Sequence, residues 1–126
     1  LPLIMPKDSK ENPTELGESY ALTVILTEGR NYYYEGSWTN ALLENRIRET
    51  SIAGLREIIT RKQKTLDDTL RYREGRKGLM LLIKASPNAS YTSVVDLLDE
   101  AVISAVEKYA LITISEEENN WLRQRE

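Results

Sequence analysis

The segment from residue 79 to residue 105 constrains the fold most, because a strand pattern gives way to a helix pattern inside it. It opens with the continuous apolar run LMLLIKA, which predicts a central strand covered on at least one face. Pro87 and Asn88 indicate a turn, and Ser90 suits the N-cap of a helix. Apolar residues then recur three and four apart, which predicts one buried helix face made of Tyr91, Val94, Val95, Leu98, Ala101, Val102 and Ala105.

The residues after this helix predict a closing strand and a short last helix. The segment KYALITIS has the pattern of a strand, so the preceding helix would connect two neighbouring strands. Such a crossover is right-handed, and its two strands are parallel. Ser115 and Glu118 form a capping-box pattern, which predicts a short final helix through Trp121 and Leu122.

The first half of the chain predicts a hairpin and then another long helix. The first strand alternates, so one face carries Leu22, Val24 and Leu26 and the other carries Thr23, Ile25 and Thr27. A turn at residues 28–31 leads into a tyrosine run. Residues 38–51 fit a loop with a short turn of helix. From Ser51 a helical stripe follows, with Lys62 or Gln63 filling its missing turn, and its apolar members are Ile52, Leu55, Ile59, Leu66 and Leu70.

Together these elements predict an α+β fold with a single mixed β-sheet of about four to five strands, in the order β-β-α-β-α-β. Both long helices have one apolar stripe, so we expect both on one face of the sheet, with a short C-terminal helix following. A chain of 126 residues suits one domain. Residues 1–19 hold three of the four prolines and predict an extended lead-in, whereas residues 20–126 predict the folded domain.

Composition excludes several kinds of chemistry. The chain has no His and no Cys, which excludes imidazole or thiolate metal sites, Ser-His and Cys-His nucleophiles and thiol redox chemistry. A net charge of −3 argues against nucleic acid as the main partner. Asp96, Asp99 and Glu100 lie off the helix stripe, where a solvated face is the simpler interpretation. We therefore expect no enzymatic activity, no cofactor and no metal.

The strand–turn–helix segment also carries a family resemblance. In IKASPNASYTSVVDLLDEA, Lys84 begins a basic-Ala pair, Tyr91 stands at a tyrosine and Asp99 at a closing aspartate. The hairpin LTVILTEGRNYYYEG, the segment LPLIMPK and the last strand ALITIS match further parts of the same pattern. The chain thus resembles the periplasmic domain of the ExbD/TolR family. It departs from the family pattern at Ser86, where an aspartate is usual, and at Ala105, where a glycine usually turns the chain.

The resemblance implies a non-enzymatic role in energy coupling. Proteins of this family have one N-terminal transmembrane helix, sit as a homodimer inside a ring of an ExbB-like channel protein, and couple the proton motive force to work across the periplasm. This chain would then be the periplasmic part of a single-pass inner-membrane subunit that drives biopolymer transport through a TonB-like transducer. In the TolR branch the implied partner is the cell wall. The alternative from the fold class is a ferredoxin-like small-molecule-binding regulatory domain.

Two segments are candidate partner-binding sites. Residues 3–5 fit either a strand that pairs with a partner chain or a linker. Residues 32–34 fit either a peptide-binding sheet edge or an ordinary amphipathic strand with the middle tyrosine on the opposite face. The expected open edges are the strand at residues 32–35 and the strand that ends at Ser115. The candidate partner-binding residues are Leu3, Ile4, Met5, Tyr32 and Tyr34.

Overall fold

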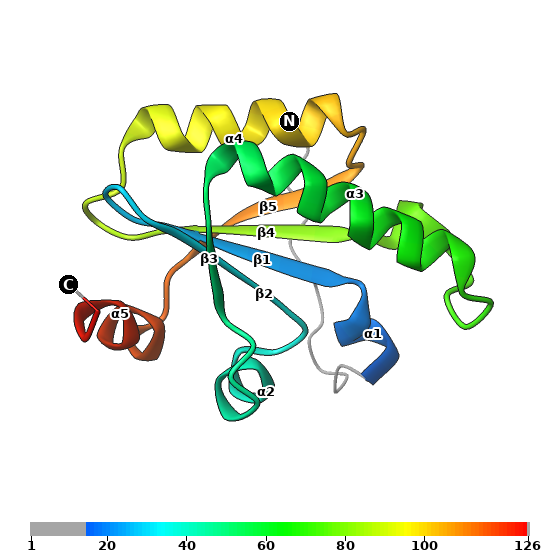
Figure 1. Cartoon of the computed structure of the whole chain (residues 1–126), viewed down its shortest axis with the longest axis horizontal. Helices are drawn as coiled ribbons and strands as arrows, with labels where there is room; N and C mark the ends of the chain where they lie inside the picture. The colour runs from blue at the N-terminus through cyan, green and yellow to red at the C-terminus, as the bar shows by residue number, and fades with distance from the viewer. Residues whose placement is uncertain (1–14, 126) are drawn as a thin grey trace.

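The computed structural model describes residues 15–125, with side chains described from residue 17 onward. Its centre is a five-stranded sheet of order β3-β2-β1-β4-β5 (Figure 1). β1 pairs antiparallel with β2 and parallel with β4, and β4 pairs parallel with β5. The predicted α+β fold with one mixed sheet is confirmed. The strands are β1 (Ala21–Leu26), β2 (Asn31–Glu35), β3 (Arg48–Thr50), β4 (Met80–Ala85) and β5 (Lys108–Thr113).

Helices cover both faces of this sheet. The two long helices, α3 (Ile52–Asp68) and α4 (Tyr91–Ile103), lie side by side on one face, as predicted (Figure 1). On the other face lie α2 (Trp38–Leu43) and α5 (Glu116–Arg123), and α5 begins with the predicted capping box. A short 3-10 helix, η1 (Gly75–Gly78), precedes β4.

Residues 15–19 differ from the predicted secondary structure, and residues 38–51 contain more regular structure than was predicted. Residues 15–19 were expected to be extended, but they form the short helix α1 (Glu15–Ser19), closed by a hydrogen bond from the Tyr20 N–H to the Gly17 carbonyl at 3.2 Å. The stretch 38–51 forms α2, capped by the Ser37 hydroxyl, and then the strand β3. β3 has three residues with the sequence RET, which carries no apolar alternation that would predict a strand.

The core lies in two clusters, one on each face of the sheet. Leu22, Val24 and Leu26 of β1 face α3 and α4, whereas Ile25 faces α2 and α5. The predicted alternation of β1 is therefore confirmed, although both of its faces are covered. β1 lies in the middle of the sheet, which explains why all of its residues from 22 to 26 are buried.

Helix α3 follows its predicted stripe except at the last residue. Leu55, Ile59, Gln63 and Leu66 are buried, and the Gln63 amide donates to the Ser104 carbonyl at 2.8 Å. Gln63 thus fills the missing turn of the stripe. The prediction for Leu70 is wrong, because the helix ends at Asp68 with Thr69 in extended conformation, and Leu70 is fully exposed.

Helix α4 buries a face that is shifted from the predicted apolar stripe toward Leu97, a residue that the predicted stripe did not include. Leu97 and Ala101 are buried, and Val94 and Leu98 pack partly against the core. The prediction that Tyr91 and Val102 are buried is wrong, since they are 82% and 66% exposed. The contact with the sheet centres on Leu97 and Ala101, so the side of the predicted stripe that carries Tyr91 and Val102 remains at the surface.

The prediction that Ala105 belongs to this helix face is also wrong, because the helix ends at Ile103 and Ala105 has a φ of 58°. This left-handed conformation favours glycine, the residue that the family pattern places there.

We expect Ala105→Gly to raise the free energy of unfolding by up to about 1 kcal/mol, because the Cβ strain disappears. Urea unfolding of the two chains measures this difference. A lower stability for Ala105→Gly would contradict the expectation.

Candidate functional site

β5 forms an open edge of the sheet in the described part of the chain. It pairs with β4 along its whole length, and none of the strands described lies on its other side. The opposite edge is β3, which has only three residues and exposes Arg48 and Glu49. A short, charged edge resists strand addition, whereas the six-residue β5 offers a row of backbone donors and acceptors. Within the described residues, the strand that ends near Ser115 is thus an open edge, as predicted.

The other predicted edge is wrong, because β2 is an inner strand. β3 pairs with residues 31–33 of β2. Tyr32 and Tyr34 are buried on the face covered by α2 and α5, whereas Tyr33 packs on the opposite face. The structure thus agrees with the ordinary amphipathic strand. The remaining candidate residues, Leu3, Ile4 and Met5, lie outside the described part of the chain.

One flank of α4 adds apolar surface beside the β5 edge. Glu100 of α4 pairs with Arg56 of α3 at 2.6 Å, so this side of α4 faces α3. The spacing of an α-helix places residues 91, 95, 98 and 102 together on the opposite flank. Leu111 of β5 pairs in register with Ile83, whose side chain lies in the core under the helices, so Leu111 points to the same side of the sheet.

We group these features under one name, the β5 edge surface. Leu111 is 47% exposed and lies on the edge strand β5, on the face of the sheet that α3 and α4 cover. Apolar side chains beside unpaired strand backbone are the usual components of a strand-addition site. The β5 edge surface comprises the open edge of β5 together with Leu111, Tyr91, Val95, Leu98 and Val102.

A buried polar contact lies on the other face, beneath α5. Glu118 of α5 is buried, and its Oε2 accepts hydrogen bonds from Lys84 Nζ at 2.7 Å and from the Tyr34 hydroxyl at 2.8 Å. Its Oε1 accepts the backbone N–H of Ser115 at 2.9 Å, which completes the capping box. Among the described residues, no further charged side chain is hydrogen-bonded to Glu118, Lys84 or Tyr34, so the ion pair is satisfied by its own members.

Sequence reasoning identified Glu118 only as a helix cap. The three side chains of the contact come from β2, β4 and α5, and Tyr34 and Glu118 are 84 positions apart. One feature of the sequence could have indicated this contact, because the alternation of β4 places Lys84 on the face opposite Leu81 and Ile83. A charged residue inside a central strand needs a partner on that face.

The contact shifts two pKa values. Burial is the largest single effect on Glu118 and would raise its pKa. Hydrogen bonds from Lys84, the Ser115 N–H and Tyr34, together with the charge of Lys84, outweigh burial, so the pKa of Glu118 lies below its ordinary value. Burial also raises the pKa of the Tyr34 phenol, and the hydrogen bond to the Glu118 carboxylate raises it further.

These shifts predict how stability depends on pH. Because the pKa of the Glu118 carboxyl is lower in the folded state, its ionised form contributes its full stabilisation above pH 4.5, the unfolded-state value. This contribution is lost as the pH falls through the lower, folded-state pKa. A raised phenol pKa stabilises the fold below pH 10.0, and this contribution is lost as the pH rises above it.

We expect the stability difference between the wild type and Glu118→Gln to be constant from pH 6 to 8 and to shrink below pH 4.5. Urea unfolding at each pH measures the difference. A difference that persists unchanged in acid would contradict the expectation.

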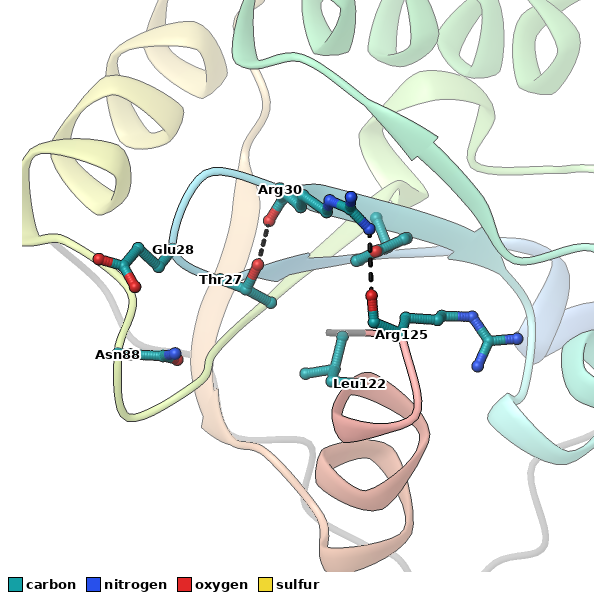
Figure 2. A pocket seen from close by; sticks show the side chains of 7 residues that line it. Thr27, Glu28, Arg30, Asn88, Leu122 and Arg125 are labelled. Carbon is teal, nitrogen blue, oxygen red and sulfur yellow. Dashed lines mark hydrogen bonds between the residues drawn. The ribbon is translucent and has the colours of Figure 1, made fainter.

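A small polar hollow lies where β1 and β4 end (Figure 2). Its volume is about 300 Å³, and its lining residues are Thr27, Glu28, Arg30, Tyr32, Asn88, Leu122 and Arg125. Arg30 donates to the Arg125 carbonyl at 3.2 Å, and Figure 2 shows the Arg125 guanidinium pointing away from Glu28 and Asn88. The described lining residues include no activated nucleophile and no pair of groups placed for proton transfer.

The described residues hold no group of three or more metal-ligating side chains, and none of the described helices is long and apolar enough to cross a membrane. Comparison with known proteins finds no matching family model, no similar curated protein and no similar solved structure. Among the described residues, the β5 edge surface combines open strand backbone with exposed apolar side chains.

Proposed function

We propose that the chain is the periplasmic domain of an ExbD-like subunit of a proton-motive-force-driven motor, which energises outer-membrane transport through a TonB-like transducer. In this proposal the domain is a non-enzymatic docking module. The sequence resemblance suggests the family, and the observation that carries the docking role is the β5 edge surface: an open six-residue strand beside apolar side chains of α4 and Leu111.

An open sheet edge suits the transient binding of an extended chain that such a coupling domain needs. A transducer that spans the periplasm presents extended chain, and an extended segment adds to β5 through backbone hydrogen bonds with little demand on its sequence. Apolar side chains of the added strand would cover Leu111 and the free flank of α4, which supplies selectivity. The backbone hydrogen bonds between β5 and the transducer break and re-form with each docking event, so the transducer can bind transiently.

The remaining parts of the proposal follow from the resemblance. The subunit would be a homodimer, anchored in the inner membrane by a single helix through which it contacts an ExbB-like channel protein. The channel protein and the helix, not this domain, would handle the protons. A cell-wall-binding role of the TolR type is the variant of this proposal in which the docking partner is glycan or peptide of the wall.

A second candidate is a ferredoxin-like small-molecule-binding regulatory domain. The polar hollow of Figure 2 favours it, because ligands of α/β sheets often bind beyond the carboxyl ends of parallel strands, and β1 and β4 are such a pair. The two candidates predict different ligand positions: the hollow for a small molecule, and the β5 edge surface for a transducer.

The docking role predicts that a charge at the β5 edge abolishes coupling. Leu111→Lys places an ammonium group at the edge, where cations hinder strand addition. We expect cells carrying Leu111→Lys in the full-length protein to lose at least tenfold of their energy-dependent outer-membrane uptake, with normal protein levels. Uptake of a labelled transporter substrate measures this loss.

The matched control is Leu43→Lys, because Leu43 is 78% exposed on α2, on the opposite face of the sheet. We expect Leu43→Lys to retain uptake. Normal uptake with Leu111→Lys, or an equal loss with both variants, would contradict the docking role of the edge.

A further inference from the structure

The connection between α3 and β4 presents a leucine among basic side chains. We name residues 69–77 the basic loop. Leu70 is 100% exposed, and its neighbours Arg71 and Arg73 are exposed as well. A single exposed leucine is common on protein surfaces and by itself indicates nothing. The cations around Leu70, the fixed shape of the loop and its place in the fold are what indicate a function.

The basic loop is held in one shape by hydrogen bonds and ring contacts. The Tyr72 N–H donates to the Thr69 carbonyl at 3.0 Å, which closes a turn. The Asp67 carboxylate accepts hydrogen bonds from the Arg76 backbone N–H at 2.8 Å and from Arg76 Nε at 2.6 Å. The Tyr72 ring meets the Tyr20 ring edge to face, with centroids 5.4 Å apart. The exposed side chains of the loop are therefore presented from a defined turn.

Cations of this loop lack carboxylate partners. Glu74 pairs with Lys108 at 3.2 Å, so its charge is already compensated, and Asp68 is the acidic residue beside the loop that forms no ion pair in the described part of the chain. Three basic side chains of the loop form no ion pair with any described residue, and these are Arg71, Arg73 and Lys77. The loop thus has surplus positive charge, although the chain as a whole has a net charge of −3.

The basic loop lies at the end of the sheet where the chain enters β1. β1 and β4 are parallel, and Ala21 pairs in register with Met80, so both strands begin at this end (Figure 1). The Glu74 N–H donates to the Tyr20 hydroxyl at 3.3 Å, which joins the loop to the residue before β1. In the proposed function the membrane anchor precedes this domain along the chain. The membrane would therefore lie on the side of the basic loop.

We propose that the basic loop docks on the anionic lipid surface of the membrane to which the domain is tethered. The presence of that membrane rests on the proposed function. The arginines would meet lipid phosphates, and Leu70 would enter the boundary between headgroups and acyl chains. A few cations and one leucine bind weakly, but a tethered domain is held at high effective concentration near the surface. A nucleic acid fits less well, because it would extend past the loop onto the acidic remainder of the chain.

Vesicle binding of the 126-residue chain tests the role of charge. We use about 0.1 M salt, where charges act over roughly 10 Å and the acidic remainder of the chain is screened. Vesicles of phosphatidylcholine with about 30 mol% phosphatidylglycerol should bind the chain at least fivefold more strongly than phosphatidylcholine alone. Each basic side chain at such a surface strengthens binding about fivefold, so Arg71→Gln combined with Arg73→Gln should remove this preference.

The matched control is Arg48→Gln combined with Arg123→Gln. These two exposed arginines lie on β3 and α5, so the control removes the same charge away from the loop. We expect the control to bind the anionic vesicles as the wild type does. Equal binding of the wild type to both kinds of vesicle, or equal losses from the two double variants, would overturn the proposal.

A fluorophore at position 70 tests whether the leucine enters the lipid. The chain has no cysteine, so Leu70→Cys provides a single attachment site for a dye that is sensitive to polarity. We expect its emission to shift to shorter wavelength when anionic vesicles are added. The same dye at Leu43→Cys, on α2 and 78% exposed in the wild type, should show no shift. No shift at position 70, or equal shifts at both positions, would overturn the proposal. The vesicles contain no transducer, so such a failure leaves the docking role of the β5 edge surface untouched.

Discussion

Leu97→Asp is expected to leave the chain unfolded in water. Leu97 is fully buried on the face of α4 that packs on the sheet, among the residues of the larger core cluster. A carboxylate there would have no partner, and burying an unpaired charge costs more than about 4 kcal/mol. That loss is a large fraction of the roughly 5–15 kcal/mol by which domains of this kind are stable. Far-ultraviolet circular dichroism and urea unfolding measure the outcome.

Val102→Asp is the matched control for this prediction. It places the same carboxylate on the same helix, at a position that is 66% exposed on the free flank. We expect a loss of stability of at most about 1 kcal/mol, part of it from the unfavourable position of an anion near a helix C-terminus. If Leu97→Asp is folded, or if both variants lose equal stability, the burial pattern of α4 is wrong.

Glu118→Gln should have the second largest effect, a loss of about 3 kcal/mol in the free energy of unfolding. Removing one partner of a buried ion pair costs roughly 3–5 kcal/mol because the other charge is left uncompensated. We expect the lower end of this range, since water reaches the Lys84 side chain, which is 15% exposed. Urea unfolding at pH 7 measures the loss.

A double-mutant cycle separates the ion pair from other effects of the substitution. In Lys84→Met with Glu118→Gln no charge remains in the contact, and we expect the stability to return to within about 1 kcal/mol of the wild type. Glu117→Gln, one residue away on the exposed side of α5, should change stability by less than about 0.5 kcal/mol. Additive losses from Lys84→Met and Glu118→Gln would show that the two groups do not interact.

The strands and their faces were predictable because side-chain alternation has a fixed period. The residues Leu22, Val24 and Leu26 could be placed on one face of β1 from the sequence, and the structure confirms this. The apolar run of β4 predicted an inner strand, and the capping box of Ser115 and Glu118 predicted the start of α5. Each of these signals is local, so one segment of sequence contains all of it.

The functional surfaces depended on tertiary placement, which local patterns do not contain. The stripe of α4 predicted buried residues at Tyr91 and Val102, but it could not show that α3 covers one flank of the helix and leaves the other open. Tyr32 and Tyr34 suggested an edge only because β3, a three-residue strand without alternation, gave no signal. The contact of Tyr34, Lys84 and Glu118 joins three elements that are distant in sequence.

The most direct test of the proposed function is an NMR titration of the isotope-labelled chain with an extended peptide from the periplasmic part of a TonB-like transducer. The docking proposal predicts that the largest amide shift changes fall on β5, from Lys108 to Thr113, with smaller changes along the free flank of α4, and that Leu111→Lys abolishes them. Leu43→Lys should leave them unchanged. Shift changes confined to the hollow of Figure 2, or no changes at millimolar peptide, would contradict the proposal that this domain binds its partner at the open sheet edge.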